Sequence, residues 1–160
     1  MLLAVAVTGT VALWPQDDKQ APQPVRAREY KPTQACLLTP SNGLADPQSA
    51  QAWAGLQDAS TQTHIQVRYL AAAGEDTAGN AAPYLASLAV GGCQAVVVTG
   101  DAEVQAAVQG AHTFPKVQFL LLQGGQGIAP ADGNAKSLTV ANPSDARTQV
   151  SAEVARLVKN

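Results

Sequence analysis

Five short apolar runs alternate with stretches of helical periodicity from residue 35 to the end of the chain, and this alternation limits the possible folds most. The runs are residues 35–39, 65–70, 95–99, 117–122 and 138–141. Continuous apolar strands separated by amphipathic helices are typical of a parallel sheet covered on both faces. The sequence therefore predicts an α/β fold: a three-layer, doubly wound parallel sheet of about five strands in the order 2-1-3-4-5, which forms a single Rossmann-like lobe.

The chain divides into three segments by composition. Residues 1–14 are uncharged and mostly apolar, residues 15–34 are rich in proline and polar side chains, and residues 35–160 hold the alternating pattern. The first segment is shorter than the roughly 20 residues of a spanning helix and lacks the basic start of an export signal. We interpret it as a truncated signal or membrane anchor, with a buried element of the fold as the alternative. The second segment is then a tether, and the third is the lobe.

The low charge of the chain bears on its partners and its compartment. Charged residues make up 14% of the sequence, the formal net charge is -2, and the ten basic residues are scattered. Nucleic-acid binding needs a clustered basic surface, so we expect no nucleic-acid partner. The order of anchor, tether and lobe predicts an extracytoplasmic protein that is membrane-anchored or secreted.

Turn and capping residues predict where the helices begin. Asp46 followed by Pro47 is a typical helix start, with the aspartate as the N-cap and the proline in the first turn. By the same criterion, Asn80 is expected to cap the second helix, Gly100 to open the third, and Ser144 to cap the last.

The two cysteines lie at corresponding places in the predicted sheet. Cys36 is near the start of the first strand and Cys93 is at the start of the third. These strands are neighbours in the order 2-1-3-4-5, so both thiols would lie at the end of the sheet opposite the strand C-termini. A disulfide between them is geometrically plausible and suits an exported protein. The alternative is two buried free thiols, which behave as small apolar residues.

The sequence contains no recognisable catalytic constellation. His64 and His112 lie at the boundaries of predicted elements. There is no histidine, cysteine and carboxylate spacing typical of zinc, no Gly-x-Ser-x-Gly elbow and no Walker phosphate loop. We therefore expect that the protein is not an enzyme and has neither a metal site nor a cofactor.

Small polar side chains gather after the predicted strands, where open α/β sheets bind their ligands. These candidate ligand-binding residues are Thr39, Ser41, Asn42, Thr99, Gly100, Asp101 and Gln123. Hydroxyl and amide groups beside exposed helix-start amides suit a neutral sugar or nucleoside. The alternative is turn and capping chemistry, because the same residue types form local hydrogen bonds at such positions.

Four stretches of the chain, in order, resemble the first lobe of the basic membrane protein (BMP) family of ABC-transporter substrate-binding proteins. They are residues 35–39, 52–56, 92–100 and 114–119, and the likeness covers roughly residues 33–155. Trp-x-Gly-Leu in the first helix and Gly-Cys before the third strand are its most specific parts. The resemblance implies a lobe like that of the type I periplasmic binding proteins, an extracytoplasmic lipoprotein context and a purine nucleoside ligand.

The chain departs from the family where the family contacts its ligand. Pro40 replaces an acidic residue, Pro47-Gln48-Ser49 replaces Ser-Phe-Asn, and Gln123 replaces a second acidic residue. No cysteine follows the apolar N-terminus to carry a lipid. The resulting hypothesis is a solute-binding-protein-like lobe for a small polar ligand, with the cleft completed by a homodimer or a partner. The alternative is a ligand-free interaction or sensor module.

Overall fold

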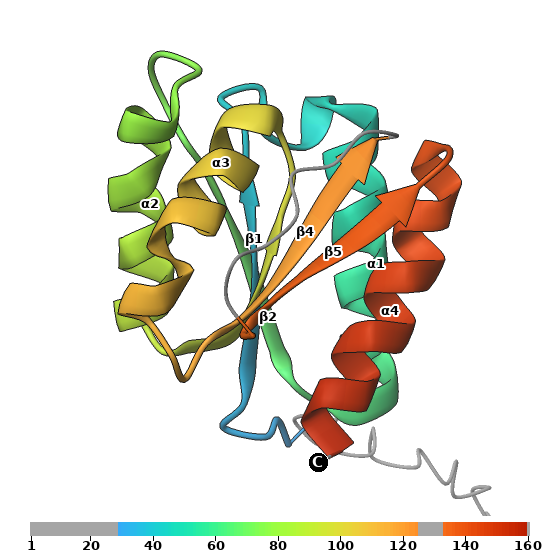
Figure 1. Cartoon of the computed structure of the whole chain (residues 1–160). Coiled ribbons are helices and arrows are strands. Elements are labelled where there is room, and N and C mark those ends of the chain that lie inside the picture. The colour runs from blue at the N-terminus through green and yellow to red at the C-terminus, as the bar shows by residue number, and fades with distance from the viewer. Residues whose placement is uncertain (1–28, 125–132, 160) are drawn as a thin grey trace, which may run out of the picture.

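The computed structural model describes residues 29–124 and 133–159, which form one α/β lobe (Figure 1). In chain order its elements are β1 (Gln34–Thr39), the 3-10 turn η1 (Gly43–Ala45), α1 (Pro47–Thr63), β2 (Gln66–Ala71), α2 (Ala78–Val90), β3 (Cys93–Val98), α3 (Asp101–Gly110), η2 (Ala111–Thr113), β4 (Gln118–Gly124), β5 (Ala135–Val140) and α4 (Pro143–Lys159).

All five strands are parallel and lie in the order β2-β1-β3-β4-β5. This confirms the predicted topology, and β2 lies at an edge of the sheet with Tyr69 47% exposed. β5 begins at Ala135, three residues earlier than the apolar run predicted, and pairs there with Phe119 of β4. The first residues of β5 do not form a continuous apolar run, because Lys136 faces solvent, as is common in an edge strand.

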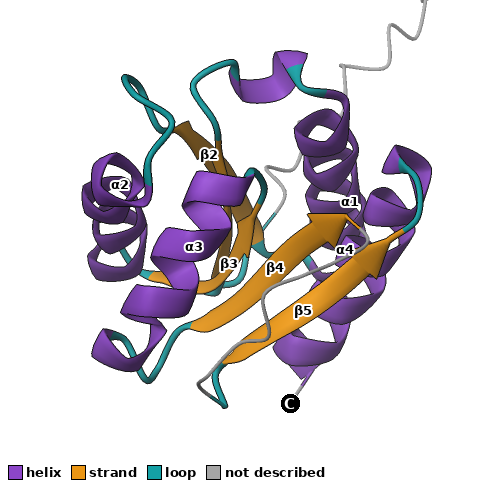
Figure 2. Ribbon diagram, turned by 45° about the horizontal axis from the view of Figure 1, so that its top comes forward, coloured by secondary structure: helices purple, strands orange, loops and turns teal. Residues whose placement is uncertain are grey.

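The helices cover the two faces of the sheet in pairs, as Figures 1 and 2 show: α1 and α4 on one face, α2 and α3 on the other. Successive side chains of each central strand point to opposite faces of the sheet. Thus Leu37 of β1 packs in the core beneath α1 and α4, whereas Leu38 packs in the core beneath α2 and α3. A sheet buried on both faces needs continuous apolar strands, which explains why the central runs could be read from the sequence.

A glycine allows α1 and α4 to approach closely. A Cβ placed on Gly55 of α1 would lie 2.5 Å from the carbonyl oxygen of Arg147 and 3.0 Å from Cβ of Val150, both in α4. Next to this contact the Arg147 guanidinium donates to both carboxylate oxygens of Asp58, at 2.6 and 2.9 Å. The helix pair is therefore held by backbone proximity at its centre and by a bidentate ion pair at its surface.

The start of α1 follows the prediction. Asp46 is the N-cap, its Oδ2 accepts from the backbone N–H of Ser49 at 2.7 Å, and Pro47 occupies the first turn. The start of α2 differs: Thr77 is the N-cap, and its hydroxyl accepts from the backbone N–H of Asn80. The side chain of Asn80 instead donates to the carbonyl groups of the loop before the helix, those of Ala73 and Glu75.

The start of α4 also differs from the prediction. Oδ1 of Asn142 accepts from the backbone N–H of Asp145 at 3.2 Å, and Ser144 donates its hydroxyl to the same oxygen. Asn142 thus does the capping expected of Ser144. The reason is that Pro143 already occupies the first helical position, so the capping side chain must precede it.

The predicted leader, residues 1–14, and residues 15–28 of the predicted tether lie outside the described residues. The last tether residues are bound to the lobe: Lys31 donates its backbone N–H to His64, and the carbonyl of Thr33 accepts from Gln66. Across residues 29–124 and 133–159, the structure contains no helix with the length and apolarity needed to span a membrane.

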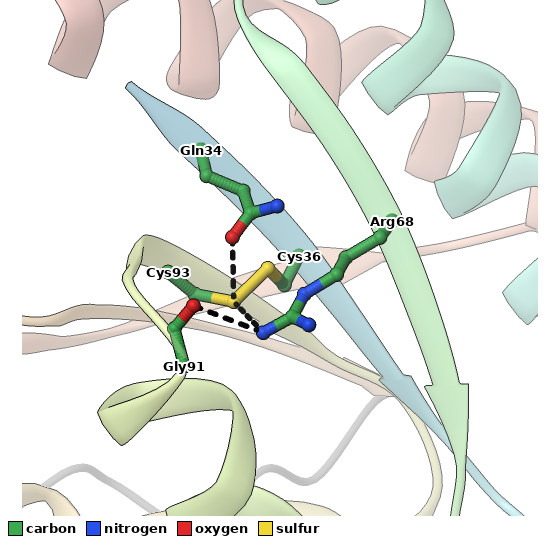
Figure 3. The surroundings of a disulfide bond; sticks show 5 residues. All are labelled: Gln34, Cys36, Arg68, Gly91 and Cys93. Carbon is green, nitrogen blue, oxygen red and sulfur yellow. Dashed lines mark hydrogen bonds between the residues drawn. A yellow bond between two sulfur atoms is a disulfide. The ribbon is translucent and has the colours of Figure 1, made fainter. Parts of the chain in front are cut away.

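A disulfide joins Cys36 of β1 to Cys93 of β3 (Figure 3), with their Cα atoms 5.9 Å apart. The pairing confirms the sequence prediction and excludes the free-thiol alternative, and it lies near the amino ends of the strands. Both cysteines are buried. The Arg68 guanidinium from β2 lies 3.5 Å from Cys93 Sγ and also donates to the carbonyl of Gly91. Oε1 of Gln34 lies 3.9 Å from the same sulfur, which carries no proton to donate once it is bonded.

Candidate functional site

The carboxyl ends of β1 and β3 form the switch point of the sheet. The chain leaves β1 toward α1 on one face and leaves β3 toward α3 on the other. Two neighbouring strands whose connections diverge in this way leave a crevice between them, which is where open α/β sheets bind ligands. We call Thr39, Pro40, Thr99 and Gly100, which end these two strands, the β1–β3 edge.

Two buried hydroxyl groups tie the β1–β3 edge to α1. Oγ of Ser49, in the first turn of α1, lies 2.7 Å from Oγ1 of Thr99, and both side chains are fully buried. Thr99 also lies within hydrogen-bond distance of the Leu38 carbonyl, at 3.3 Å, while the Thr39 hydroxyl donates to the carbonyl of Pro40. These contacts fix the first turn of α1 against the end of β3 and satisfy both threonine hydroxyls within the fold.

Gly100 makes room for a carboxyl group at this edge. Its φ of +90° is one that side-chain-bearing residues rarely adopt. A Cβ at this position would overlap Oε2 of Glu103 and would lie 2.5 Å from Cγ of Pro40. The carboxyl group of Glu103, from the first turn of α3, therefore turns back over Gly100 and faces the end of β1.

Glu103 is the buried ionisable group of this edge. Its residue is 2% exposed, and its Oε2 has no hydrogen-bond partner among the described residues. Burial raises the pKa of the Glu103 carboxyl above its usual value, its own backbone N–H opposes this by donating to the carboxyl group, and Asp76 and Asp101 raise the pKa further. The edge thus holds an acid whose charged form is disfavoured and whose second oxygen is unsatisfied.

The structure brings most of the predicted ligand-binding residues to the two loops of this edge. Ser41, Asn42 and Asp101 are exposed, Gly100 is partly exposed, and Thr39 and Thr99 are buried. Gln123 is also buried but lies one strand further along, in β4. The ligand-binding role of these residues stays a prediction, and the exposed ones are those a ligand could reach without rearrangement.

Sequence reasoning missed Ser49 and Glu103. In the sequence Ser49 stands out only as part of a departure from the BMP pattern, and Glu103 lies where acidic residues commonly complement the helix dipole. The sequence holds one signal for Glu103. It is the second acidic residue in the first turn of α3, after Asp101, and it directly precedes the buried Val104. A carboxylate placed directly beside the buried stripe of a helix needs an explanation beyond the dipole.

Other features of the described residues lie away from this edge. No group of three or more histidine, cysteine, aspartate or glutamate side chains in residues 29–124 and 133–159 could hold a metal ion. Hollows of about 330, 270 and 180 Å³ lie toward the amino ends of the strands. Their respective linings include Gln66 of β2, Val117 before β4, and Gln94 of β3. None of the three reaches the switch point.

No protein-family model matches the chain, and no curated protein matches it. Solved structures do share its fold. A putative lipoprotein from Peptoclostridium difficile 630, crystallised as a fragment, has 14% identity and a TM-score of 0.63 over 80% of this chain and 99% of its own. An ABC transporter system solute-binding protein from Aeropyrum pernix K1 has 15% identity and a TM-score of 0.51 over 64% of this chain.

A transcriptional activator of the comK gene from Bacillus halodurans is similar to the same degree, with 17% identity and a TM-score of 0.51 over 65% of this chain. The chain spans 33% of the length of that activator and 27% of the length of the Aeropyrum protein. At these identities the likeness shows the fold alone. The same fold thus occurs in part of a solute-binding protein, in part of a transcriptional activator and in a lipoprotein fragment of nearly the same extent as this chain.

Proposed function

We propose that the chain is an extracytoplasmic, BMP-like solute-binding lobe that holds a small polar ligand, such as a nucleoside or sugar, at the carboxyl ends of its strands. The observation that carries this proposal is the switch point between β1 and β3, near which all of the predicted polar residues except Gln123 lie. A ligand there would contact Ser41, Asn42 and Asp101 first, because these side chains are exposed. The proposal assigns no catalytic step to the protein.

A single lobe supplies one wall of the cleft in which such proteins enclose a ligand. The chain spans 27% of the length of the Aeropyrum solute-binding protein. In the proposal the second wall comes from a second copy of the lobe or from a partner protein. Ligand binding would then favour association, because a ligand held between two copies stabilises the pair.

The proposed location outside the cytoplasmic membrane is supported by the Cys36–Cys93 disulfide. Disulfides persist in oxidising compartments and are rare where thiols are kept reduced. The similarity to a lipoprotein fragment agrees with this location. Membrane tethering belongs to the proposal as well, and it is tested by fractionating cells that express the chain from its Met1.

A thermal-shift screen with adenosine, inosine, glucose and ribose tests the binding function. A ligand present at about 100 times its dissociation constant should stabilise the protein by about 2.7 kcal/mol. Sedimentation with and without the ligand that gives a shift then reports whether a dimer forms. The absence of any shift across the panel, at high protein concentration, would contradict the proposal.

Matched aspartate variants locate the ligand. Asp101→Asn removes an exposed carboxylate in the first turn of α3, beside the switch point. Asp145→Asn removes a partly exposed carboxylate in the first turn of α4, which follows the edge strand β5. We expect weaker ligand binding in the first variant and unchanged binding in the second. Equal effects would place the ligand elsewhere.

One observation favours the alternative, a ligand-free interaction or sensor module. The hydroxyls of Thr39, Ser49 and Thr99 all make hydrogen bonds within the fold. Groups that are already satisfied gain little from a ligand. The alternative predicts no stabilisation by any small molecule and a complex with a protein partner that forms without a ligand. The proposed function instead predicts stabilisation by a small polar ligand.

A further inference from the structure

We propose, building on the ligand-binding function above, that the β1–β3 edge selects a small polar ligand carrying a protonated amine, and that Glu103 is the residue that receives the amine. The geometry points to this class of ligand. The carboxyl group of Glu103 turns over Gly100 toward Pro40, at the point of the sheet where the two connections diverge. The residue Glu103 is 2% exposed, and its Oε2 has no hydrogen-bond partner in the described part of the chain.

A buried carboxyl oxygen without a partner is rare in a native protein. Leaving such a group unsatisfied destabilises the folded state, and more so when the group is charged. At a structural position this cost would favour a leucine or glutamine. At a binding position the cost disappears when a ligand donates the missing hydrogen bond, so the unsatisfied atom marks where a ligand donor belongs.

The charges around Glu103 decide the kind of donor. The two charged side chains that act on it are Asp76, from the loop before α2, and Asp101, from the first turn of α3. Both are acidic and exposed. Three carboxyl groups, one from the loop before α2 and two from the first turn of α3, attract a cation and repel an anion.

An organic ammonium group fits better than a metal ion. No cluster of acidic, histidine or cysteine side chains among the described residues could hold a metal. An ammonium group needs separate acceptors at hydrogen-bond distance rather than a closed coordination shell. Rotation of the Glu103 side chain toward solvent would present Oε2 to the amine, near the exposed carboxylates of Asp76 and Asp101. Ser41 and Asn42 then remain for the hydroxyl groups of the same ligand.

Two pairs of compounds that differ in their ammonium groups test this selectivity. Glucosamine replaces one hydroxyl of glucose by an ammonium group, and putrescine replaces both hydroxyls of butanediol. Calorimetric titration of the full chain at neutral pH should give about tenfold or tighter binding for the amine in at least one pair, because a charge-assisted hydrogen bond is roughly twice as strong as a neutral one. Equal or weaker binding of the amine in both pairs overturns the inference.

Matched variants assign the preference to Glu103. Glu103→Gln keeps the size of the side chain and removes its charge, so it should abolish the preference for the amine. Glu29→Gln removes the same charge at an exposed site before β1 and should leave the preference intact. Retention of the preference in Glu103→Gln would overturn the assignment. The comparison of compounds on the unaltered protein decides the selectivity even if a variant fails to fold.

The outcomes separate this inference from the function on which it rests. If glucose, butanediol or adenosine binds and neither amine is preferred, the lobe binds solutes and the amine selectivity is wrong. If none of the compounds in either test binds, both proposals fail. Added salt supplies a further check, since it should weaken binding of the amine and leave binding of its neutral counterpart unchanged.

Discussion

The side chains of Ser49 and Thr99, 50 residues apart in the sequence, meet hydroxyl to hydroxyl at 2.7 Å with neither exposed to solvent. This contact joins the first turn of α1 to the end of β3 across the switch point. The contact positions the β1–β3 edge without any ligand. Its contribution can therefore be measured as the change in the free energy of unfolding when the contact is removed.

Ser49→Ala should lower the free energy of unfolding by about 1–2 kcal/mol, because the Thr99 hydroxyl then loses one of its two buried hydrogen-bond partners. Urea unfolding followed by circular dichroism measures the change. The control is Ser41→Ala, which truncates an exposed side chain on the neighbouring loop and should change stability by less than about 0.5 kcal/mol. Equal midpoints for the two variants would show that the contact contributes nothing.

Loss of the Cys36–Cys93 disulfide should destabilise the lobe by about 4 kcal/mol, since the bond closes a loop across a sequence separation of 57 and limits the unfolded chain. The comparison is between oxidised protein and the Cys36→Ala/Cys93→Ala double variant in urea. Thiol titration of the denatured protein should find no free thiol before reduction and two afterwards. A midpoint unchanged by the double substitution would contradict this prediction.

Glu103 should make the protein less stable as pH rises. Its folded-state pKa is raised above the usual value of 4.5, by burial first and by Asp76 and Asp101 in addition. The folded state therefore binds more protons than the unfolded state between the two pKa values. Stability contributed by protonated Glu103 is present in full below the unfolded pKa and is lost as pH rises through the folded pKa.

Glu103→Gln removes this dependence and should be more stable than the parent protein at neutral pH. Asp58 affects stability in the opposite direction. The hydrogen bond from Arg147 lowers the pKa of Asp58, so the stability that ionised Asp58 contributes is lost as pH falls through that lowered pKa. Asp58→Asn removes this loss at low pH. Urea midpoints of the three proteins at a series of pH values measure both effects. A parent protein and Glu103→Gln variant with parallel pH profiles would refute the assignment to Glu103.

Two helical glycines should respond oppositely to alanine. Gly55→Ala places a methyl group against the backbone of Arg147, so we expect a loss of about 1–3 kcal/mol as α1 and α4 are forced apart. Gly79→Ala, in the first turn of α2, meets no atom within 4 Å and should stabilise the protein by about 0.4–1 kcal/mol by restricting the unfolded chain. Thermal unfolding of both variants measures the difference, and a stabilised Gly55→Ala would disprove the close packing of the helices.

Much of the fold was predictable because strands buried on both faces must be apolar throughout. The valines of β3 and the leucines of β1 mark central strands whichever way the helices pack. Edge strands and helix caps were less predictable. The exposed Lys136 interrupts the apolar pattern at the start of β5. The capping residues Thr77 and Asn142 lie only three and two residues before the predicted caps, Asn80 and Ser144.

The candidate site was predictable only in outline. Parallel strands end at one edge, so polar residues such as Ser41, Asn42 and Asp101 could be grouped from their places in the pattern. The hydrogen-bond partners of Thr99 and the burial of Glu103 could not be predicted from the sequence, because they depend on where α1 and α3 pack against the sheet.

By itself the sequence determined the layered α/β architecture, since this follows from the local pattern of apolar residues. It also predicted the strand order and made a disulfide between the two cysteines plausible, with free thiols as the alternative. Only the tertiary structure decided which polar groups are satisfied within the fold and which are left over. That division depends on contacts between residues far apart in the chain. It separates Thr99, bonded to Ser49, from Glu103, whose Oε2 has no partner among the described residues.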